Sequence, residues 1–210
     1  VGVPSIIMQS ISSVMTFGMN KILIGFSETA VAVFGVYFKL QSFIFMPIFG
    51  LNNGMIPIVA YNYGARSKKR IMETVWLSIG IAMGIMLIGL MVFHLMTPQL
   101  LMLFQADEEM LAIGVPALRI ISLSFLFAGY CIIVGSVFQA LGNGVYSLII
   151  SVARQLVCIL PLAWFFARTF GLHAVWLSLP LAEITSVVLS SILFRKIYLD
   201  KIKPLGQAAA

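Results

Sequence analysis

The sequence predicts an all-α integral membrane protein with six transmembrane helices. Of its 210 residues, 61% are hydrophobic and only 10% are charged, whereas a soluble domain carries about a quarter charged residues. Long apolar stretches recur, each matching the roughly 20 residues that cross the hydrocarbon core of a bilayer as a helix. The stretches are continuous, while strands of outer-membrane barrels alternate over about ten residues. A helical bundle in a lipid bilayer is therefore expected.

The first two spans are expected at residues 5–23 and 30–60, joined by a polar link that contains Gly25 and Ser27. The second span is long and includes Pro47 and Pro57. Proline inside a spanning helix frees backbone groups that a neighbouring helix or a water-lined cavity must satisfy. We therefore expect this span to be kinked and packed against other helices.

The remaining four spans are expected at 74–95, 112–140, 145–167 and 174–194. A basic loop, 66–70, precedes the third span, and a short amphipathic piece that ends in three acidic residues, 107–109, follows it. Small residues four apart, such as Gly80 and Gly84, allow close helix approach in lipid. The six spans are therefore expected to pack as one bundle.

Charge in the loops predicts the orientation in the inner (plasma) membrane. Basic residues cluster at 66–70 and 195–203, and loops rich in Lys and Arg stay in the cytoplasm. Six crossings then place both ends of the chain in the cytoplasm. The chain opens at Val1 without a charged segment before an apolar core, so we expect a piece of a longer protein without a cleavable signal peptide.

Several classes of function are not expected. The net charge of +6 comes from basic residues in short loops, so a nucleic-acid partner is not expected. Cys131 and Cys158 lie in apolar stretches, and His94 and His173 have no partner at ligand spacing, so neither a disulfide nor a metal site is expected. The sequence contains neither a glycine-rich phosphate-binding loop nor a Ser/His/Asp catalytic triad, so we expect neither an enzyme nor a cofactor.

Four ionisable residues fall inside the expected spans: Lys39, Arg119, Arg154 and Glu183. Each costs about 2.5–3.5 kcal/mol at the centre of a membrane helix and is thus a functional candidate. Lys39, Arg119 and Glu183 lie about ten residues into their spans, which puts them at similar depth, so we expect them to meet. Glu183 is the best single candidate, because Arg154 can snorkel toward the headgroups.

Polar amides form a second group of candidates. They are Gln9 and Asn20 on the first span, Asn52 and Asn53 on the second, Gln139 on the fourth and Gln155 on the fifth. Amides often hold helices together in lipid. Asn52 and Asn53 lie between two glycines in the expected kink, which favours a place in a cavity wall. Apolar aromatic and Met side chains nearby, such as Phe49 and Met55, suit either an adaptable pocket or a lipid-facing surface.

Four segments resemble the C-terminal six-helix lobe of multidrug and toxic compound extrusion (MATE) transporters. These are VGVPSIIMQ (1–9), PIFGLNNGMIPIVAYNYGA (47–65), FQALGNGVYS (138–147) and ARQLVCILPLAW (153–164). The resemblance implies one lobe of a two-lobed transporter, with the N-terminal lobe as its partner around a central cavity. It also implies export of small amphipathic, often cationic, compounds in exchange for protons or sodium ions.

One departure from the family affects the coupling ion. Some members carry a coupling carboxylate on the first or fourth helix of this lobe, where this chain has Gln9 and Arg119. The resemblance thus favours protons slightly over sodium. Two alternatives stay open: a flippase for lipid-linked saccharides, in which Lys39 and Arg119 would bind diphosphate, and a membrane assembly subunit without transport of its own.

Overall fold

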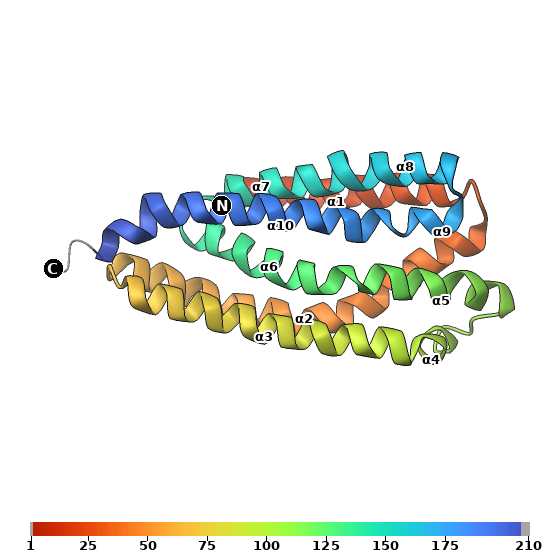
Figure 1. The fold of residues 1–210 in the computed structure, drawn as a ribbon, viewed down its shortest axis with the longest axis horizontal. Coiled ribbons are helices and arrows are strands. Elements are labelled where there is room, and N and C mark those ends of the chain that lie inside the picture. Colours follow the sequence, from red (N-terminus) through yellow and green to blue (C-terminus); the bar gives the residue numbers. More distant parts are fainter. Residues whose placement is uncertain (1, 207–210) are drawn as a thin grey trace.

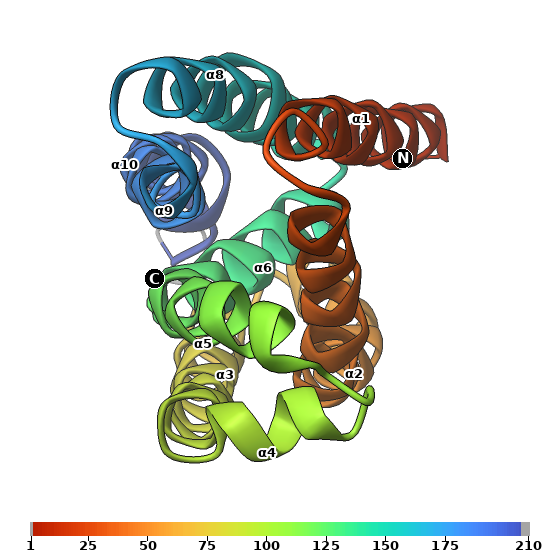
Figure 2. The same cartoon turned by 90° about the vertical axis from the view of Figure 1, so that its right-hand side faces the viewer.

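A computed structural model describes residues 2–206, in which the chain is helical almost throughout. The helices run along the long axis of an elongated bundle (Figure 1). Seen along that axis, α6 lies between two groups, with α1, α8 and α10 on one side and α2 and α3 on the other (Figure 2). Helices α1 and α2 meet at one end of the bundle and diverge toward the other (Figure 1). At the other end, the chain after α10 returns to the start of α3, where Lys68 Nζ lies 5.4 Å from the ring centroid of Tyr198, so the two groups are in contact at both ends.

Thirteen helical elements are described. They are α1 (Gly2–Leu23), α2 (Glu28–Gly64), α3 (Lys68–Leu95), α4 (Thr97–Met102), α5 (Glu108–Ser122), α6 (Ser124–Ala140), α7 (Gly144–Val152), the π-helix η1 (Ala153–Ile159), α8 (Leu160–Thr169), α9 (Leu172–Val175), α10 (Ser178–Ile197), the π-helix η2 (Tyr198–Ile202) and the 3₁₀-helix η3 (Lys203–Gly206).

Side-chain caps begin two of the described helices. Helix α2 begins after Ser27, whose Oγ accepts a hydrogen bond from the backbone N–H of Ala30 at 3.1 Å, and α5 begins after Asp107, which accepts from Met110 in the same way. Helix α2 continues through Pro47 and Pro57 for 37 residues. Residues 68–70, expected in a loop, instead form the first turn of α3.

The described helices broadly match the expected spans. Four segments are long and apolar enough to cross a membrane, Glu28–Gly64, Lys68–Leu95, Gly144–Thr169 and Leu172–Leu205, and the pair α5–α6 makes a fifth if its 45° bend lies within one span. That bend, near Leu123, was not expected. Helix α1 is long enough at 22 residues but is less apolar than these segments.

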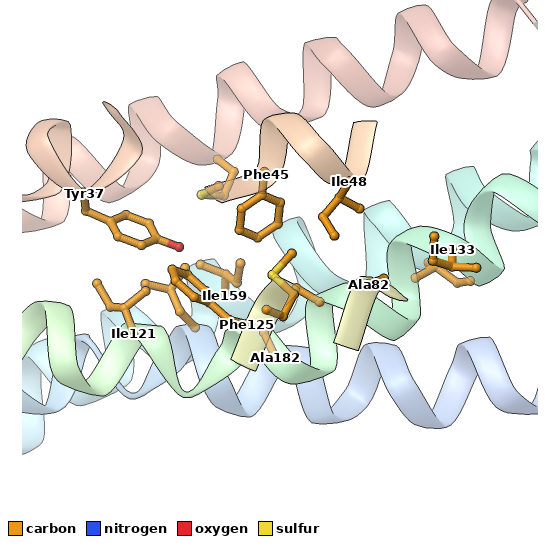
Figure 3. Close-up of a cluster of buried hydrophobic side chains, with 14 of the residues drawn as sticks. Tyr37, Phe45, Ile48, Ala82, Ile121, Phe125, Ile133, Ile159 and Ala182 are labelled. Atoms are coloured by element: carbon orange, nitrogen blue, oxygen red, sulfur yellow. The ribbon is translucent and has the colours of Figure 1, made fainter. Parts of the chain in front are cut away.

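Aromatic and aliphatic side chains fill the core between α2, α3 and α6. Phe125 lies edge-on to Phe93 and to Phe45, with ring centroids 5.0 and 5.6 Å apart. Figure 3 shows Phe45 and Ile48 of α2 pointing toward Phe125. Outside the bundle, large apolar side chains such as Trp76 and Ile88 are exposed. An apolar exterior around an apolar core is the pattern expected of a protein that lipid solvates.

Close helix approach occurs at glycines other than those expected. Gly89 of α3 lies against Ile44 of α2, and a Cβ atom there would come within 2.5 Å of the Ile44 side chain. Gly80 and Gly84, by contrast, are exposed, and a Cβ atom on either would meet nothing within 4 Å. The expectation that this pair packs against a neighbour within the lobe is therefore wrong.

Candidate functional site

An ion pair joins Arg154 and Glu183 inside the bundle. Arg154 Nη1 donates to Glu183 Oε1 at 2.7 Å. Glu183 is 7% exposed on α10, and Arg154 is part-buried at the start of the π-helix η1. The wider turn of a π-helix changes which face of a span a residue occupies. The π-helix η1 packs against α10, and Arg154 is paired with Glu183 there, so the expectation that Arg154 snorkels toward the headgroups is wrong.

Each partner also keeps an unused polar atom. Arg154 Nε and Glu183 Oε2 are buried and have no hydrogen-bond partner in the described part of the protein. Tyr37 of α2 and Cys131 of α6 lie within electrostatic range of the pair. Arg–carboxylate pairs often form two parallel hydrogen bonds, whereas this pair forms one. Arg154 and Glu183 therefore each retain hydrogen-bonding capacity.

A cavity of about 350 Å³ adjoins the pair. Its walls come from α1, α2, α6, α7, η1 and α10: Met8, Phe49, Asn52, Asn53, Ile56, Cys131, Ile132, Gly135, Ser136, Gln139, Ser147, Ile150, Ser151, Arg154 and Ser186. Arg154 is the only charged residue among these lining residues, whereas Glu183 is not one of them. The cavity is therefore lined by the basic member of the ion pair and not by its acidic member.

Amides and hydroxyls supply the other polar groups of the wall. Asn52 is 7% exposed, and its Oδ1 is buried without a hydrogen-bond partner among the described residues. Asn53 and Gln139 also line the cavity, as does Ser151, to which Gln155 donates at 3.4 Å. Asn52 and Asn53 thus lie where the sequence placed them, in a cavity wall.

Lys39 and Arg119 do not join Glu183. Lys39 Nζ lies 5.7 Å from the ring centroid of Phe104, and Arg119 Nε donates to Thr97 Oγ1 at 3.3 Å. Neither residue lines the cavity. The expectation that Lys39, Arg119 and Glu183 form one cluster is wrong, because equal depth along a helix says nothing about the side of the helix on which a residue lies.

Helix α1 carries a polar stripe that includes Gln9 and Asn20, which were expected only as separate amide candidates. Gln9 and Asn20 lie on it together with four other residues, and all six line a shallow groove: Gln9, Ser12, Ser13, Thr16, Phe17 and Asn20. Spacings of three and four residues put these side chains on one helix face, and that periodicity could have been found in the sequence. Several of the hydroxyls donate to the carbonyl four residues back, as Thr16 does to Ser12 at 2.9 Å.

The histidines and cysteines form no metal centre in the described region. No group of three or more His, Cys, Asp or Glu side chains with metal-binding geometry occurs in residues 2–206. His94 Nδ1 lies 3.2 Å from Ser122 Oγ, and both cysteines are free thiols.

Comparison with known proteins assigns the chain to a family. The MatE family model matches residues 4–165, more than half of the chain. This chain belongs to the MatE family. The multidrug export protein MepA of Staphylococcus haemolyticus (strain JCSC1435) is 27% identical over 183 residues, which cover 87% of this chain and 40% of that protein. The chain therefore spans less than half the length of the MatE relatives that it matches.

Solved MATE structures share the fold. A MATE multidrug resistance transporter in an outward-facing conformation matches with a TM-score of 0.88 and 25% identity over 99% of this chain and 46% of that one. An inward-facing conformation matches equally well, with a TM-score of 0.88 and 25% identity over 100% of this chain and 48% of that one. The described chain thus corresponds to one lobe of a larger MATE membrane transporter.

Proposed function

We propose that this chain is the C-terminal lobe of a secondary-active antiporter that exports amphipathic compounds in exchange for protons or sodium ions. The observation that carries the proposal is the equal match to outward-facing and inward-facing MATE structures. A lobe that fits both states equally well suits alternating access by rocking of two rigid lobes around a shared cavity. The N-terminal lobe would supply the opposite wall.

The Arg154–Glu183 pair is the best candidate for coupling within this lobe. Among the described residues, Glu183 is the only acidic residue deep inside a spanning segment. Arg154, Tyr37 and Cys131 surround it from three other elements. A carboxylate in a low-dielectric site gains or loses a proton according to the position of its counter-charge. A lobe movement that shifts Arg154 relative to Glu183 would therefore change proton occupancy.

Transport by the whole protein in proteoliposomes tests this role. Glu183→Gln keeps the shape of the side chain but removes its titratable charge, so we expect gradient-driven efflux of a fluorescent drug to fall at least tenfold. Imposed proton and sodium gradients, applied separately, identify the coupling ion. Glu73→Gln is the matched control, because Glu73 lies at the exposed start of α3, 3.9 Å from Lys69. Parent-like efflux by Glu183→Gln from pH 6 to pH 8 would exclude Glu183 from coupling.

A flippase for lipid-linked saccharides receives less support. Such a cavity would need several cations for a diphosphate, but Lys39 and Arg119 do not line the cavity beside Arg154. Gradient-driven efflux of a drug by the reconstituted protein would also exclude a purely structural subunit.

A further inference from the structure

The charge that lines the cavity is positive. We propose that the cavity is an anion subsite, which binds the carboxylate, sulfonate or phosphate head of an amphipathic molecule at Arg154. This inference rests on the proposed export function and narrows the class of substrate that this lobe binds. It differs from the expectation of a cationic substrate, because the described wall presents a guanidinium and no carboxylate.

The geometry of the ion pair leaves Arg154 able to take a second anion. Its Nη1 contacts Glu183 Oε1 at 2.7 Å, and its buried Nε has no partner among the described residues. A guanidinium carries five N–H donors in a planar fork that matches two oxygens of a carboxylate or phosphate. Glu183 takes only one of these donors, and 29% of the Arg154 side chain remains accessible beside the cavity, so an anionic head can bind the guanidinium as well.

The rest of the wall suits the other parts of such a molecule. Asn52, Asn53 and Gln139 line the same cavity as Arg154 and supply amide groups for hydrogen bonds to the ligand. Met8, Phe49 and Ile56 supply an apolar surface for the body of the ligand. A volume of about 350 Å³ lies near the lower end of ligand pockets. The occupant is therefore a compact amphiphile.

Cations find no comparable partner in this cavity. Arg154 lines the cavity and Glu183 does not, and the one carboxylate oxygen of Glu183 that has a partner is bound to Arg154. A cationic head in the cavity would lie near a like charge without an acidic side chain in the lining to balance it, and like charges in a low-dielectric site repel strongly. Recognition of a cation by the whole transporter would thus need groups from the other lobe.

Two dansyl probes of similar size test the preference. Dansylglycine carries a carboxylate, and dansylaminoethyl-trimethylammonium carries a fixed positive charge. Binding to the whole transporter in phosphatidylcholine nanodiscs is measured by dansyl fluorescence. We expect dansylglycine to bind and Arg154→Gln to weaken it at least tenfold. Arg168→Gln should change nothing, because Arg168 lies in the same span but stacks on Trp164 at 4.5 Å, outside the cavity.

A second variant gives a gain of binding that misfolding cannot produce. Glu183→Gln removes the carboxylate that competes for Arg154, so dansylglycine should bind several-fold more tightly, while the ammonium probe should not. Unchanged dansylglycine affinity in both Arg154→Gln and Glu183→Gln would overturn the subsite, as would tighter binding of the ammonium probe by the parent protein.

Lipid and solute are the two possible sources of the anionic head. The same binding assay is repeated in nanodiscs that contain phosphatidylglycerol, an anionic lipid. If dansylglycine binds the parent protein more weakly there than in phosphatidylcholine, and Arg154→Gln shows no such difference between the two lipids, the subsite binds a lipid headgroup. Equal affinity in the two lipids assigns it to a soluble solute. Drug efflux is measured on the same preparation. Efflux without dansylglycine binding would refute the subsite alone, and binding without gradient-driven efflux would refute the proposed function alone.

Discussion

Arg154 and Glu183 pair inside the bundle, where Glu183 is buried and Arg154 is partly buried. Each ion is costly in a low-dielectric medium, and the attraction between them repays the cost only while both are present. Removal of one partner leaves the other uncompensated, which typically costs about 3–5 kcal/mol for a buried pair. Arg154 is partly exposed, with 29% of its side chain accessible, so the effect here should lie toward the lower end.

This asymmetry gives a stability prediction. Arg154→Met alone should lower the midpoint of thermal unfolding in detergent by several degrees, since it leaves the carboxyl group of Glu183 buried without its partner. The double change Arg154→Met with Glu183→Leu should recover most of the loss, because an apolar pair fills similar space without a desolvation cost. Arg168→Met serves as the control. If the double variant is less stable than Arg154→Met alone, the ion pair stabilises the bundle more than an apolar pair of similar size does.

At the scale of single residues, the sequence identified both members of the ion pair as candidates but did not predict that they pair with each other. Insertion cost selected four residues, Lys39, Arg119, Arg154 and Glu183, of which Arg154 and Glu183 form an ion pair. Depth along a straight helix then suggested Lys39 and Arg119 as partners of Glu183. Glu183 is instead paired with Arg154, which lies in the π-helix η1, and the hydrophobic pattern of the sequence does not reveal a π turn. Asn52 and Asn53 line the cavity, but they do so from a continuous α-helix that runs through both prolines.

Helices α2 and α3 contact each other closely at Gly89. A side chain at this position would collide with Ile44, since a Cβ atom would already lie 2.5 Å from its Cγ2. Gly89→Leu should therefore destabilise the lobe by about 1–3 kcal/mol, the usual cost of overpacking. Thermal unfolding of the purified protein measures the change.

The same helix offers the control for this experiment. Gly80→Leu places the same side chain on an exposed face, where a Cβ atom meets nothing within 4 Å. It should leave stability within about 0.5 kcal/mol of the parent. Equal effects of Gly89→Leu and Gly80→Leu would mean that α3 does not pack tightly against α2 at Gly89.

At the scale of elements, length and hydropathy predicted most spans, and local breaks escaped prediction. The third span starts earlier than expected because residues 68–70 form a helical turn after the short link 65–67. The fourth expected span bends by 45° between α5 and α6. Neither the bend nor the π turn has an apolar pattern different from that of an ordinary helix, so periodicity does not distinguish them.

The charge pattern predicts the orientation of the whole molecule in the membrane. Lys69 and the C-terminal basic cluster should face the cytoplasm, and Glu108 should face outward. In a background without Cys131 and Cys158, Lys69→Cys should resist an impermeant maleimide added to intact cells, while Glu108→Cys should react. Lys69 suits the test because 87% of its side chain is exposed. Rapid labelling of Lys69→Cys with protection of Glu108→Cys would reverse the predicted orientation.

A single lobe should not transport. Alternating access needs a second lobe to move against, and the solved MATE chains are about twice as long as this one. Cells that express residues 1–210 alone should remain as sensitive to a dye such as ethidium as cells with an empty vector. Co-expression with the other lobe as a separate chain is the informative control. Robust efflux by residues 1–210 without that lobe would contradict the two-lobed mechanism, unless the protein assembles as a symmetrical dimer.

The polar stripe of α1 has a consequence for the biogenesis of the protein. A helix whose apolar residues are interrupted by Gln9, Ser12, Ser13, Thr16 and Asn20 partitions from the translocon into lipid less readily than α2 or α3. Its stable insertion must depend on helices made after it, above all α7 and α8, which pack along it (Figure 1). Helix α1 would thus be held at the translocon until the rest of its lobe has been synthesised.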